Sequence, residues 1–160
     1  MPKRYYGTGA HLTGIRKATI SDLPEIETCA VAAYTLYVER IGREPAPMVA
    51  NFAASIRKGH LYVAQEDGQI VGFVVFYPEQ DHVHLENVAV TPGFQNRGIG
   101  TKLIGFVEQQ AQQDGYTRIE LYTNARMTEN LGLYPRLGFE QFDRRVEDGF
   151  DRIYFRKTLD

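Results

Sequence analysis

The chain has 160 residues, of which 43% are hydrophobic and 24% are charged, and these fractions are ordinary for a globular protein of one domain. They exclude a disordered chain and a fibrous repeat, and the single cysteine, Cys29, excludes a domain held together by intramolecular disulfides. A net charge of -2 gives no argument for nucleic acid or an anionic membrane as partner, and no segment has the ~18 apolar residues of a membrane span. The N-terminus lacks the apolar stretch of a secretory signal. We therefore expect a soluble cytoplasmic protein.

Hydrophobic periodicity and turn residues predict a loose leader over residues 1–13 and a single domain over 14–160. In chain order the expected elements are a strand at 14–18, helices at 23–41 and 48–57, strands at 61–66, 70–77 and 83–90, a helix at 98–114, a strand at 118–123, a helix at 127–137 and a strand pair within 139–158. This order predicts an α/β sandwich, in which helices pack on the faces of a mixed sheet.

Two segments carry more specific expectations. Pro45 and Pro47 predict that residues 43–47 have no regular structure, because proline removes a backbone donor and fixes φ. The strand at 70–77 is apolar on both faces, so we expect it in the middle of the sheet, covered on both sides.

The most informative segment runs from Val88 to Leu103, where a buried strand enters a loop with two close glycines and an amphipathic helix begins. Free N–H groups and the positive end of the helix dipole converge at such a start. Gln95, Arg97 and the main-chain amides of 97–101 are therefore predicted to hold a pyrophosphate. The same glycines are equally compatible with a tight turn between strand and helix.

Two familiar phosphate loops fit this segment poorly. A Walker loop needs Lys followed by Ser or Thr after its second glycine, whereas the order here is Gly100-Thr101-Lys102. The dinucleotide fingerprint needs Gly or Ala where Leu103 stands, and an acidic residue after the next strand, which here ends in Thr123-Asn124. A nucleotide-binding α/β protein is therefore the weakest interpretation.

At this loop the chain resembles the GNAT superfamily of acyl-CoA N-acyltransferases. Gln95-Asn96-Arg97-Gly98-Ile99-Gly100 is similar to that family's Gln/Arg-x-x-Gly-x-Gly/Ala loop. An Asn-containing helix that ends in Tyr134-Pro135-Arg136-Leu137-Gly138-Phe139 resembles a second family motif, and Ala18-Thr19-x-x-Asp22-Leu23-Pro24 resembles the entry into its first helix. The resemblance covers about residues 14–158. It implies a GNAT-like sandwich, whose mixed and mostly antiparallel sheet splays into a V and is flanked by helices.

The resemblance also implies direct transfer of an acetyl group from acetyl-CoA to an amine, without a metal. The pantetheine arm is expected between the splayed strands, where main-chain groups of Val88, Ala89 and Val90 pair with it and the Val90 N–H polarises the thioester carbonyl. Asn124 and Asn130 compete for a hydrogen bond to this arm. The residues expected to bind acetyl-CoA are Val88, Ala89, Val90, Gln95, Asn96, Arg97, Gly98, Ile99, Gly100, Thr101, Asn124, Asn130 and Tyr134.

Two residues are candidates for proton transfer in such a reaction. Glu86 is the expected base: regular pairing places it on the strand face of Val88 and Val90, a bulge could re-aim it, and burial beside apolar neighbours would raise the pKa of a carboxylate. His84 is the second candidate base, and a surface Glu in an ion pair is the alternative. Tyr134 matches the family's general acid, while Pro135 predicts a kink or an early end of its helix.

The acceptor side is predicted to include Tyr34, Tyr37, Arg40 and Arg43, which would hold an amine carrying a carboxylate or an aromatic group. A solvated lid is the alternative for this segment. Cys29 is expected to be an inert buried thiol.

The leading hypothesis is thus an N-acetyltransferase acting on a small-molecule or peptide amine, with neither nucleic acid nor membrane as partner. A non-catalytic acyl-CoA-binding module is the alternative, and the presence of both candidate proton-transfer residues favours the enzyme. A homodimer through the C-terminal strands is expected by analogy with folds of this kind.

Overall fold

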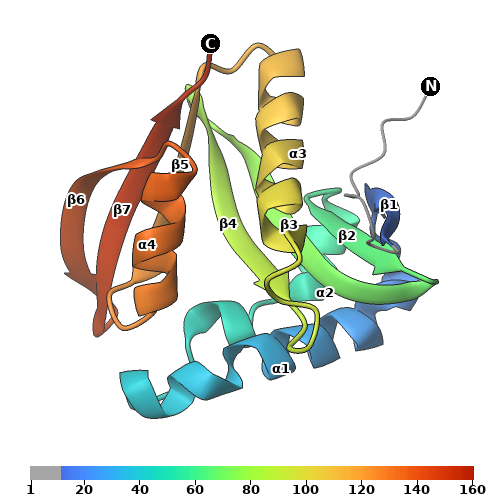
Figure 1. Cartoon of the computed structure of the whole chain (residues 1–160). Helices are drawn as coiled ribbons and strands as arrows, with labels where there is room; N and C mark the ends of the chain where they lie inside the picture. Colours follow the sequence, from blue (N-terminus) through green and yellow to red (C-terminus); the bar gives the residue numbers. More distant parts are fainter. Residues whose placement is uncertain (1–11) are drawn as a thin grey trace.

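The computed structural model describes residues 12–160, and these form a seven-stranded sheet with helices on both of its faces (Figure 1). The elements are β1 (Leu12–Lys17), η1 (Ile20–Asp22), α1 (Leu23–Ile41), η2 (Ala46–Met48), α2 (Phe52–Arg57), β2 (Leu61–Glu66), β3 (Gln69–Glu79), β4 (His82–Val90), α3 (Ile99–Gln113), β5 (Arg118–Asn124), α4 (Thr128–Arg136), β6 (Glu140–Glu147) and β7 (Phe150–Thr158). The strand order is β1-β2-β3-β4-β5-β7-β6, and only β4 and β5 pair in parallel. The expected mixed, mostly antiparallel sandwich is confirmed.

Strand β3 lies between β2 and β4 and is buried on both faces, as its apolar sequence predicts. Val71 and Val74 pack into the core under α3 and α4, whereas Phe73 and Val75 pack into the core against α1 and α2. Gly72 allows this layering, because a Cβ there would lie 2.8 Å from the Ala89 carbonyl oxygen and 3.3 Å from Leu103 of α3. The glycine therefore sets how closely α3 approaches the sheet.

The structure corrects three element boundaries. Residues 1–11 of the predicted leader lie outside the described chain, but residues 12 and 13 belong to β1. The segment predicted to be irregular contains the 3-10 turn η2, since proline at the first positions of a helical turn loses no intrahelical hydrogen bond. The second helix is shorter than predicted, because Asn51 caps α2 by accepting a hydrogen bond from the Ala54 N–H at 3.1 Å.

The sheet opens where β4 meets β5. These strands pair only at Val83 with Ile119 and at His84 with Glu120, and beyond these two positions they diverge (Figure 1). Helix α1 runs across the open end of the V, and Arg40 near its end pairs with Glu129 of α4 at 2.7 Å. The splayed sheet is therefore confirmed, and α1 connects its two halves.

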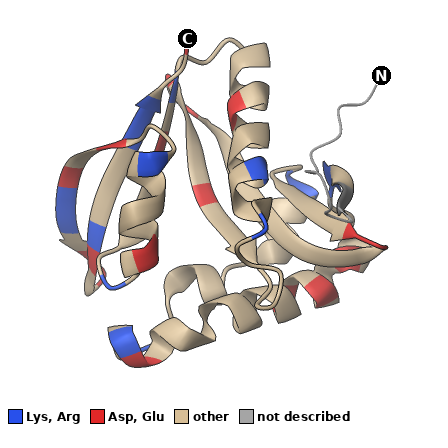
Figure 2. Cartoon of the chain, viewed as in Figure 1, with Lys and Arg blue, Asp and Glu red and all other residues tan. Residues whose placement is uncertain are grey.

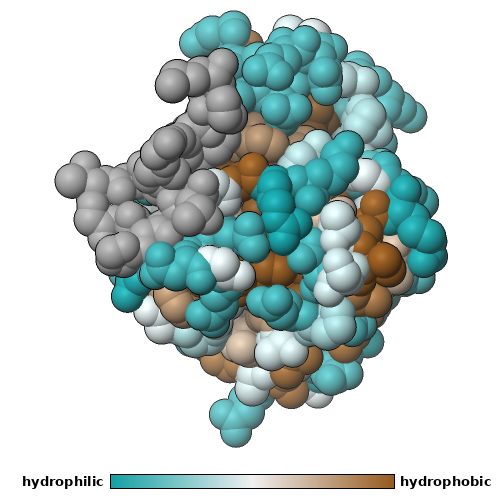
Figure 3. Space-filling model, turned by 90° about the vertical axis from the view of Figure 1, so that its right-hand side faces the viewer, coloured by the Kyte–Doolittle hydropathy of each residue, from teal (hydrophilic) through white to brown (hydrophobic). Residues whose placement is uncertain are grey.

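The described surface carries many charged side chains. Residues of both charge signs lie along β6 and β7 (Figure 2), and Figure 3 shows hydrophobic residues on one face in small patches between hydrophilic ones. Among residues 12–160, no helix has both the length and the apolar character needed to span a bilayer.

Candidate active site

Strand β4 carries a bulge at the point where it begins to leave β5. Asn87 pairs with Val75 of β3 and Leu85 pairs with Phe76, so Glu86 has no partner residue on β3. One extra residue in an antiparallel strand bends the strand and re-aims the side chain at that position. The bulge therefore directs Glu86 into the opening of the V.

The bulge also shifts the alternation of faces along β4. Leu85 packs into the core under α3, and after the bulge Val88 and Val90 pack against that same core while Ala89 faces α1. Glu86 consequently does not share a face with Val88 and Val90. The expectation from regular pairing is wrong, and the bulged arrangement is observed.

The carboxylate of Glu86 is exposed and accepts a hydrogen bond from the Tyr77 hydroxyl at 3.0 Å. Burial and the Glu86 charge both raise the pKa of Tyr77, and the His60 ring stacks on Tyr77 with 5.0 Å between centroids. From the sequence we expect Glu86 to be buried beside apolar neighbours, and the structure shows that it is exposed. His84 lies between aromatic rings and burial lowers its pKa, but it is not among the residues that line a cavity.

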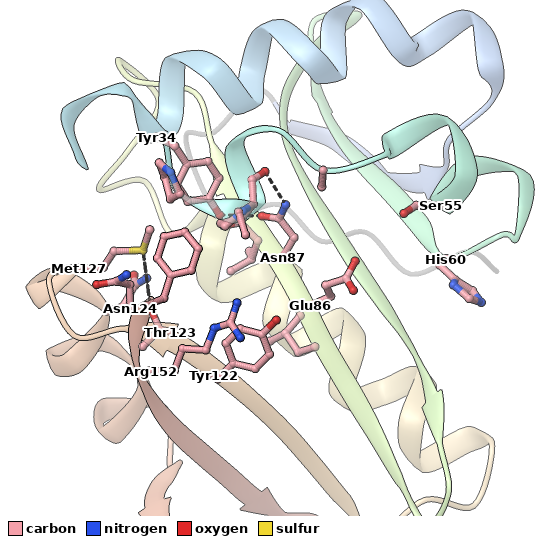
Figure 4. A pocket seen from close by; sticks show the side chains of 18 of the residues that line it. Tyr34, Ser55, His60, Glu86, Asn87, Tyr122, Thr123, Asn124, Met127 and Arg152 are labelled. Atoms are coloured by element: carbon pink, nitrogen blue, oxygen red, sulfur yellow. Dashed lines mark hydrogen bonds between the residues drawn. The ribbon is translucent and has the colours of Figure 1, made fainter. Parts of the chain in front are cut away.

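A cavity of about 710 Å³ opens in front of Glu86 (Figure 4). One wall comes from β4 and the segment around α2, and the facing wall comes from β5, α4 and β7. Its polar and aromatic lining includes Tyr34, Lys58, His60, Tyr77, Glu86, Asn87, Tyr122, Asn130, Tyr134 and Arg152. We call this space the acceptor cavity.

A second cavity of about 530 Å³ lies between the end of β4, the loop before α3, and α4. Its lining includes Tyr37, Val88, Ala89, Val90, Gln95, Asn96, Gly98, Ile99, Gly100 and Thr101. Tyr34, Val88 and Asn130 line both spaces, so the two cavities adjoin inside the V. We call the second space the loop cavity.

Main-chain groups of β4 face the opening. The Thr91 N–H donates to the Val71 carbonyl oxygen at 2.8 Å, so antiparallel alternation turns the polar groups of Ala89 toward β3 and those of Val88 and Val90 toward β5. The Val88 carbonyl oxygen lies 3.0 Å from the Tyr34 hydroxyl, and the Val90 carbonyl accepts a hydrogen bond from Gln95. The N–H groups of Val88 and Val90 are thus the donors that β4 presents to a ligand.

The loop before α3 presents further N–H groups to the loop cavity. Asn96 has a φ of 64° and Gly98, the residue that precedes the helix, has a φ of 79°. No side chain caps this helix start and its first turn has no acidic residue, so the N–H groups and the helix dipole are available to an anion. Gly100 adds room, since a Cβ there would touch only Val90, at 3.7 Å. The described residues therefore fit a diphosphate.

One residue of the predicted pyrophosphate site turns away from it. The Arg97 guanidinium donates to Glu66 at 3.1 Å and is not among the residues that line the loop cavity. Glu66 is buried, and its other carboxylate oxygen has no hydrogen-bond partner among the described residues. Arg97 therefore neutralises a buried carboxylate in this structure.

Tyr134 lies in the last turn of α4, which includes Pro135 and ends at Arg136, one residue before the predicted end. Its ring packs against Phe139 and Phe155, each with 5.6 Å between centroids. Burial raises the pKa of Tyr134, and its hydroxyl makes no hydrogen bond to another described residue. A neutral phenol with a free hydroxyl thus lines the acceptor cavity.

The two asparagines differ in their positions. Asn130 donates to the Thr123 hydroxyl at 3.0 Å and lines both cavities. Asn124 accepts a hydrogen bond from the Arg126 N–H at 2.8 Å, which engages its side-chain oxygen in the turn after β5. Asn130 is therefore better placed than Asn124 to hydrogen-bond a ligand where the two cavities meet.

The four residues predicted for the acceptor side separate into two groups. Tyr34 lines both cavities and Tyr37 lines the loop cavity, whereas neither Arg40 nor Arg43 is among the lining residues of either one. The Arg40 guanidinium holds the pKa of Glu129 down at about 2. Arg43 stacks on the Phe150 ring, 3.5 Å from its centroid, and donates to the Asp148 carbonyl. Arg40 thus connects α1 to α4, and Arg43, just after α1, contacts the segment where β6 turns into β7.

Sequence reasoning missed several polar and aromatic cavity residues, namely Lys58, His60, Tyr77, Asn87, Tyr122 and Arg152. The last two, on β5 and β7, bring a ring and a cation to the wall that faces Glu86. The available signal was weak: alternation along β5 and β7 puts them on the sheet face opposite Leu121 and Ile153, but not next to Glu86. Among residues 12–160, no group of three or more His, Cys, Asp or Glu side chains is arranged to hold a metal ion.

The sequence profile of the Acetyltransferase (GNAT) family matches residues 25–139. Probable N-acetyltransferase 14 of Xenopus tropicalis is 34% identical over 89 residues, which cover 54% of this chain and 43% of that protein. The chain spans about half the length of the curated relatives it matches.

Solved structures of low sequence identity share the fold. The ribosomal-protein-S18-alanine N-acetyltransferase of Escherichia coli superposes with a TM-score of 0.72 at 21% identity, covering 91% of this chain and 92% of that one. A GNAT family acetyltransferase of Elizabethkingia anophelis with acetyl-CoA bound gives 0.70 at 24% identity, covering 93% and 99%.

Proposed function

Because the chain belongs to the acetyltransferase (GNAT) family, we propose that it transfers an acetyl group from acetyl-CoA directly to an amine of a small molecule or peptide. The observation that carries this proposal is the pair of adjoining cavities along the bulged strand β4. One cavity offers anion-binding N–H groups, and the other offers a carboxylate and a phenol. The alternative, a non-catalytic acyl-CoA-binding module, would not need the carboxylate and the phenol.

In this proposal the loop cavity binds the acyl donor. The main-chain amides at the start of α3 bind the diphosphate, and the N–H groups of Val88 and Val90 bind carbonyl oxygens of the pantetheine arm. The Val90 N–H also polarises the thioester carbonyl, as a single donor aimed at developing negative charge does. Asn130 supplies a further polar contact at the junction of the two cavities.

The acceptor cavity binds the amine, and Glu86 is the proposed base. The exposed carboxylate reaches a protonated amine directly or through water, while the hydrogen bond from Tyr77 holds it in place. The neutral nitrogen attacks the thioester carbonyl carbon, and the carbon–sulfur bond breaks. Tyr134 is the proposed general acid, because burial keeps its phenol protonated and a thiolate leaving group needs a proton or a strong hydrogen bond.

The test measures release of free CoA thiol from acetyl-CoA with a panel of amines, amino acids and short peptides. Tyr134→Phe is expected to lower turnover by about 10²- to 10⁴-fold and to leave acetyl-CoA affinity unchanged in a binding titration. Tyr116→Phe is the matched control, since Tyr116 lines neither cavity. Equal turnover by wild type and Tyr134→Phe would refute Tyr134 as the acid.

Glu86→Gln tests the base beside Glu79→Gln, a control at the end of β3 that lines neither cavity. Loss of turnover in Glu86→Gln alone supports the base. Binding of acetyl-CoA without turnover on any amine would favour the acyl-CoA-binding module, and absence of binding would refute both functions. The cytoplasmic location and the homodimer through the C-terminal strands stay predictions.

A further inference from the structure

Arg152 of β7 is a guanidinium held in the wall of the acceptor cavity without a hydrogen-bond acceptor. Its side chain is 13% exposed and lies over the Tyr122 ring, 4.5 Å from the centroid. The carboxylate contacts of Nη1, to Glu147 at 3.6 Å and to Asp148 at 3.9 Å, are both longer than a hydrogen bond. Nε and Nη2, the two donors that fit a carboxylate side by side, have no partner among the described residues.

This situation distinguishes Arg152 from the other arginines of the described chain. Arg16 and Arg144, for example, each donate two hydrogen bonds to one aspartate. The other arginines whose guanidinium donates no hydrogen bond to a described residue are exposed to water, which satisfies their donors: Arg57, Arg126, Arg136 and Arg156. Arg152 is largely withdrawn from water, and its donors face the cavity that it lines.

The charges around the cavity suit a ligand with two opposite charges. Figure 4 shows Arg152 and Glu86 pointing into the cavity from the β7 side and the β4 side, with Tyr122 beside Arg152. An ammonium group is attracted to Glu86, and an anionic group is attracted to the guanidinium. A buried Arg commonly binds a carboxylate through two parallel hydrogen bonds, which add geometric specificity to the charge attraction.

We propose that Arg152 binds a carboxylate of the acceptor, and that the acceptor is therefore a small amine that carries a carboxylate, as an amino acid does. This inference rests on the proposed acetyltransferase function and adds the substrate class. It assigns to Arg152 the role that the sequence suggested for Arg40 and Arg43, which are engaged elsewhere. Lys58, the other cation of the cavity lining, is exposed at the end of α2 and has no planar pair of donors.

The experiment measures kcat and KM at saturating acetyl-CoA for amino acids and for their carboxamides, which keep the amine and lose the anion. Wild type is expected to prefer the amino acids by at least about tenfold in kcat/KM. Arg152→Gln should raise KM for amino acids by about 10- to 100-fold and leave KM for carboxamides within about twofold. Arg152→Lys should fall between the two, because it keeps the charge and loses the paired donors.

Arg156→Gln is the matched control, since Arg156 lies on the same strand, stacks on Phe142 and lines neither cavity. It should have wild-type kinetics, and thermal unfolding of each variant checks that it is folded. Equal use of carboxamides by wild type would overturn the inference while leaving the acetyltransferase function intact. Loss of carboxylate preference in Lys58→Gln instead of Arg152→Gln would overturn it as well.

Failure of the proposed function gives a different result. If no amine releases CoA from acetyl-CoA, calorimetry measures binding of the same amino acids to wild type and Arg152→Gln in the presence of CoA. Binding that requires both the carboxylate and Arg152 would support the anion site without the reaction. Equal binding by both proteins, or no binding by wild type, would overturn it.

Discussion

Tyr34 joins helix α1 to the bulged strand β4, so its hydroxyl is a sharp target for mutation. The hydroxyl donates to the side-chain oxygen of Asn87 at 2.6 Å and lies 3.0 Å from the Val88 carbonyl oxygen. Both Tyr34 and Asn87 are buried. Tyr34→Phe keeps the ring and removes the one described donor to the Asn87 oxygen, while the Asn87 amide keeps its bond to the Pro47 carbonyl.

Tyr34→Phe should lower the free energy of unfolding because it leaves the buried side-chain oxygen of Asn87 without a donor. A buried hydrogen-bond acceptor without a donor costs about 1–3 kcal/mol. Because phenylalanine keeps the aromatic ring, no further loss from packing is expected. For a chain of this length each kcal/mol lowers the thermal midpoint by about 2–4 °C. The predicted decrease is therefore about 2–12 °C.

Thermal and urea unfolding, followed by circular dichroism, measure this difference. Tyr116→Phe is the control, because the Tyr116 hydroxyl makes no hydrogen bond to a described residue and its loss should leave stability nearly unchanged. A midpoint for Tyr34→Phe within about 1 °C of the control would show that water satisfies Asn87 equally well. The argument that the Tyr34 hydroxyl fixes the bulged strand would then be wrong.

Three further predictions concern the parts that support the site. The Arg16 guanidinium lowers the pKa of Asp22 to about 2, so the pair stabilises the fold above about pH 4 and loses this effect as the pH falls through about 2. Asp22→Asn should therefore lower the free energy of unfolding by about 1–2 kcal/mol at neutral pH, and urea titrations that show the same difference near pH 2 would contradict this. Gly72→Ala should lower the free energy of unfolding by about 1–3 kcal/mol, because the added Cβ would clash with the Ala89 carbonyl oxygen. Gly105→Ala in α3 is the control, since its added Cβ would have no neighbour within 4 Å and should not destabilise the protein. Cys29 is 3% exposed and burial raises the pKa of its thiol, so a disulfide reagent should label it only on unfolding; rapid labelling of the native protein would contradict the burial.

Local pattern was sufficient for the elements that have one strong periodicity. The bounds of α1 agree with the prediction because one apolar stripe runs from the Pro24 start to Gly42, which ends the helix with a φ of 88°. Strand β3 was predicted to be central because it is apolar on both faces. The loop before α3 was recognised because glycine spacing and a helix start are both local features.

The site required information that local pattern lacks. The bulge at Glu86 depends on the register between β3 and β4, and a single strand sequence does not determine that register. Arg40 and Arg152 look alike in the sequence, but the first lies beside Glu129 and the second over Tyr122. Which arginine reaches a cavity is decided by tertiary pairing across the V.

The seam between β4 and β5, where the two halves of the sheet meet, is short. Two residue pairs join the halves within the sheet, and the proposed base belongs to one half while the proposed acid and Arg152 belong to the other. The distance between these groups therefore depends on the angle at which the two halves diverge, and the seam is one of the contacts that fix this angle. A substitution beside Ile119, remote from both cavities, should therefore alter the catalytic rate without touching either substrate.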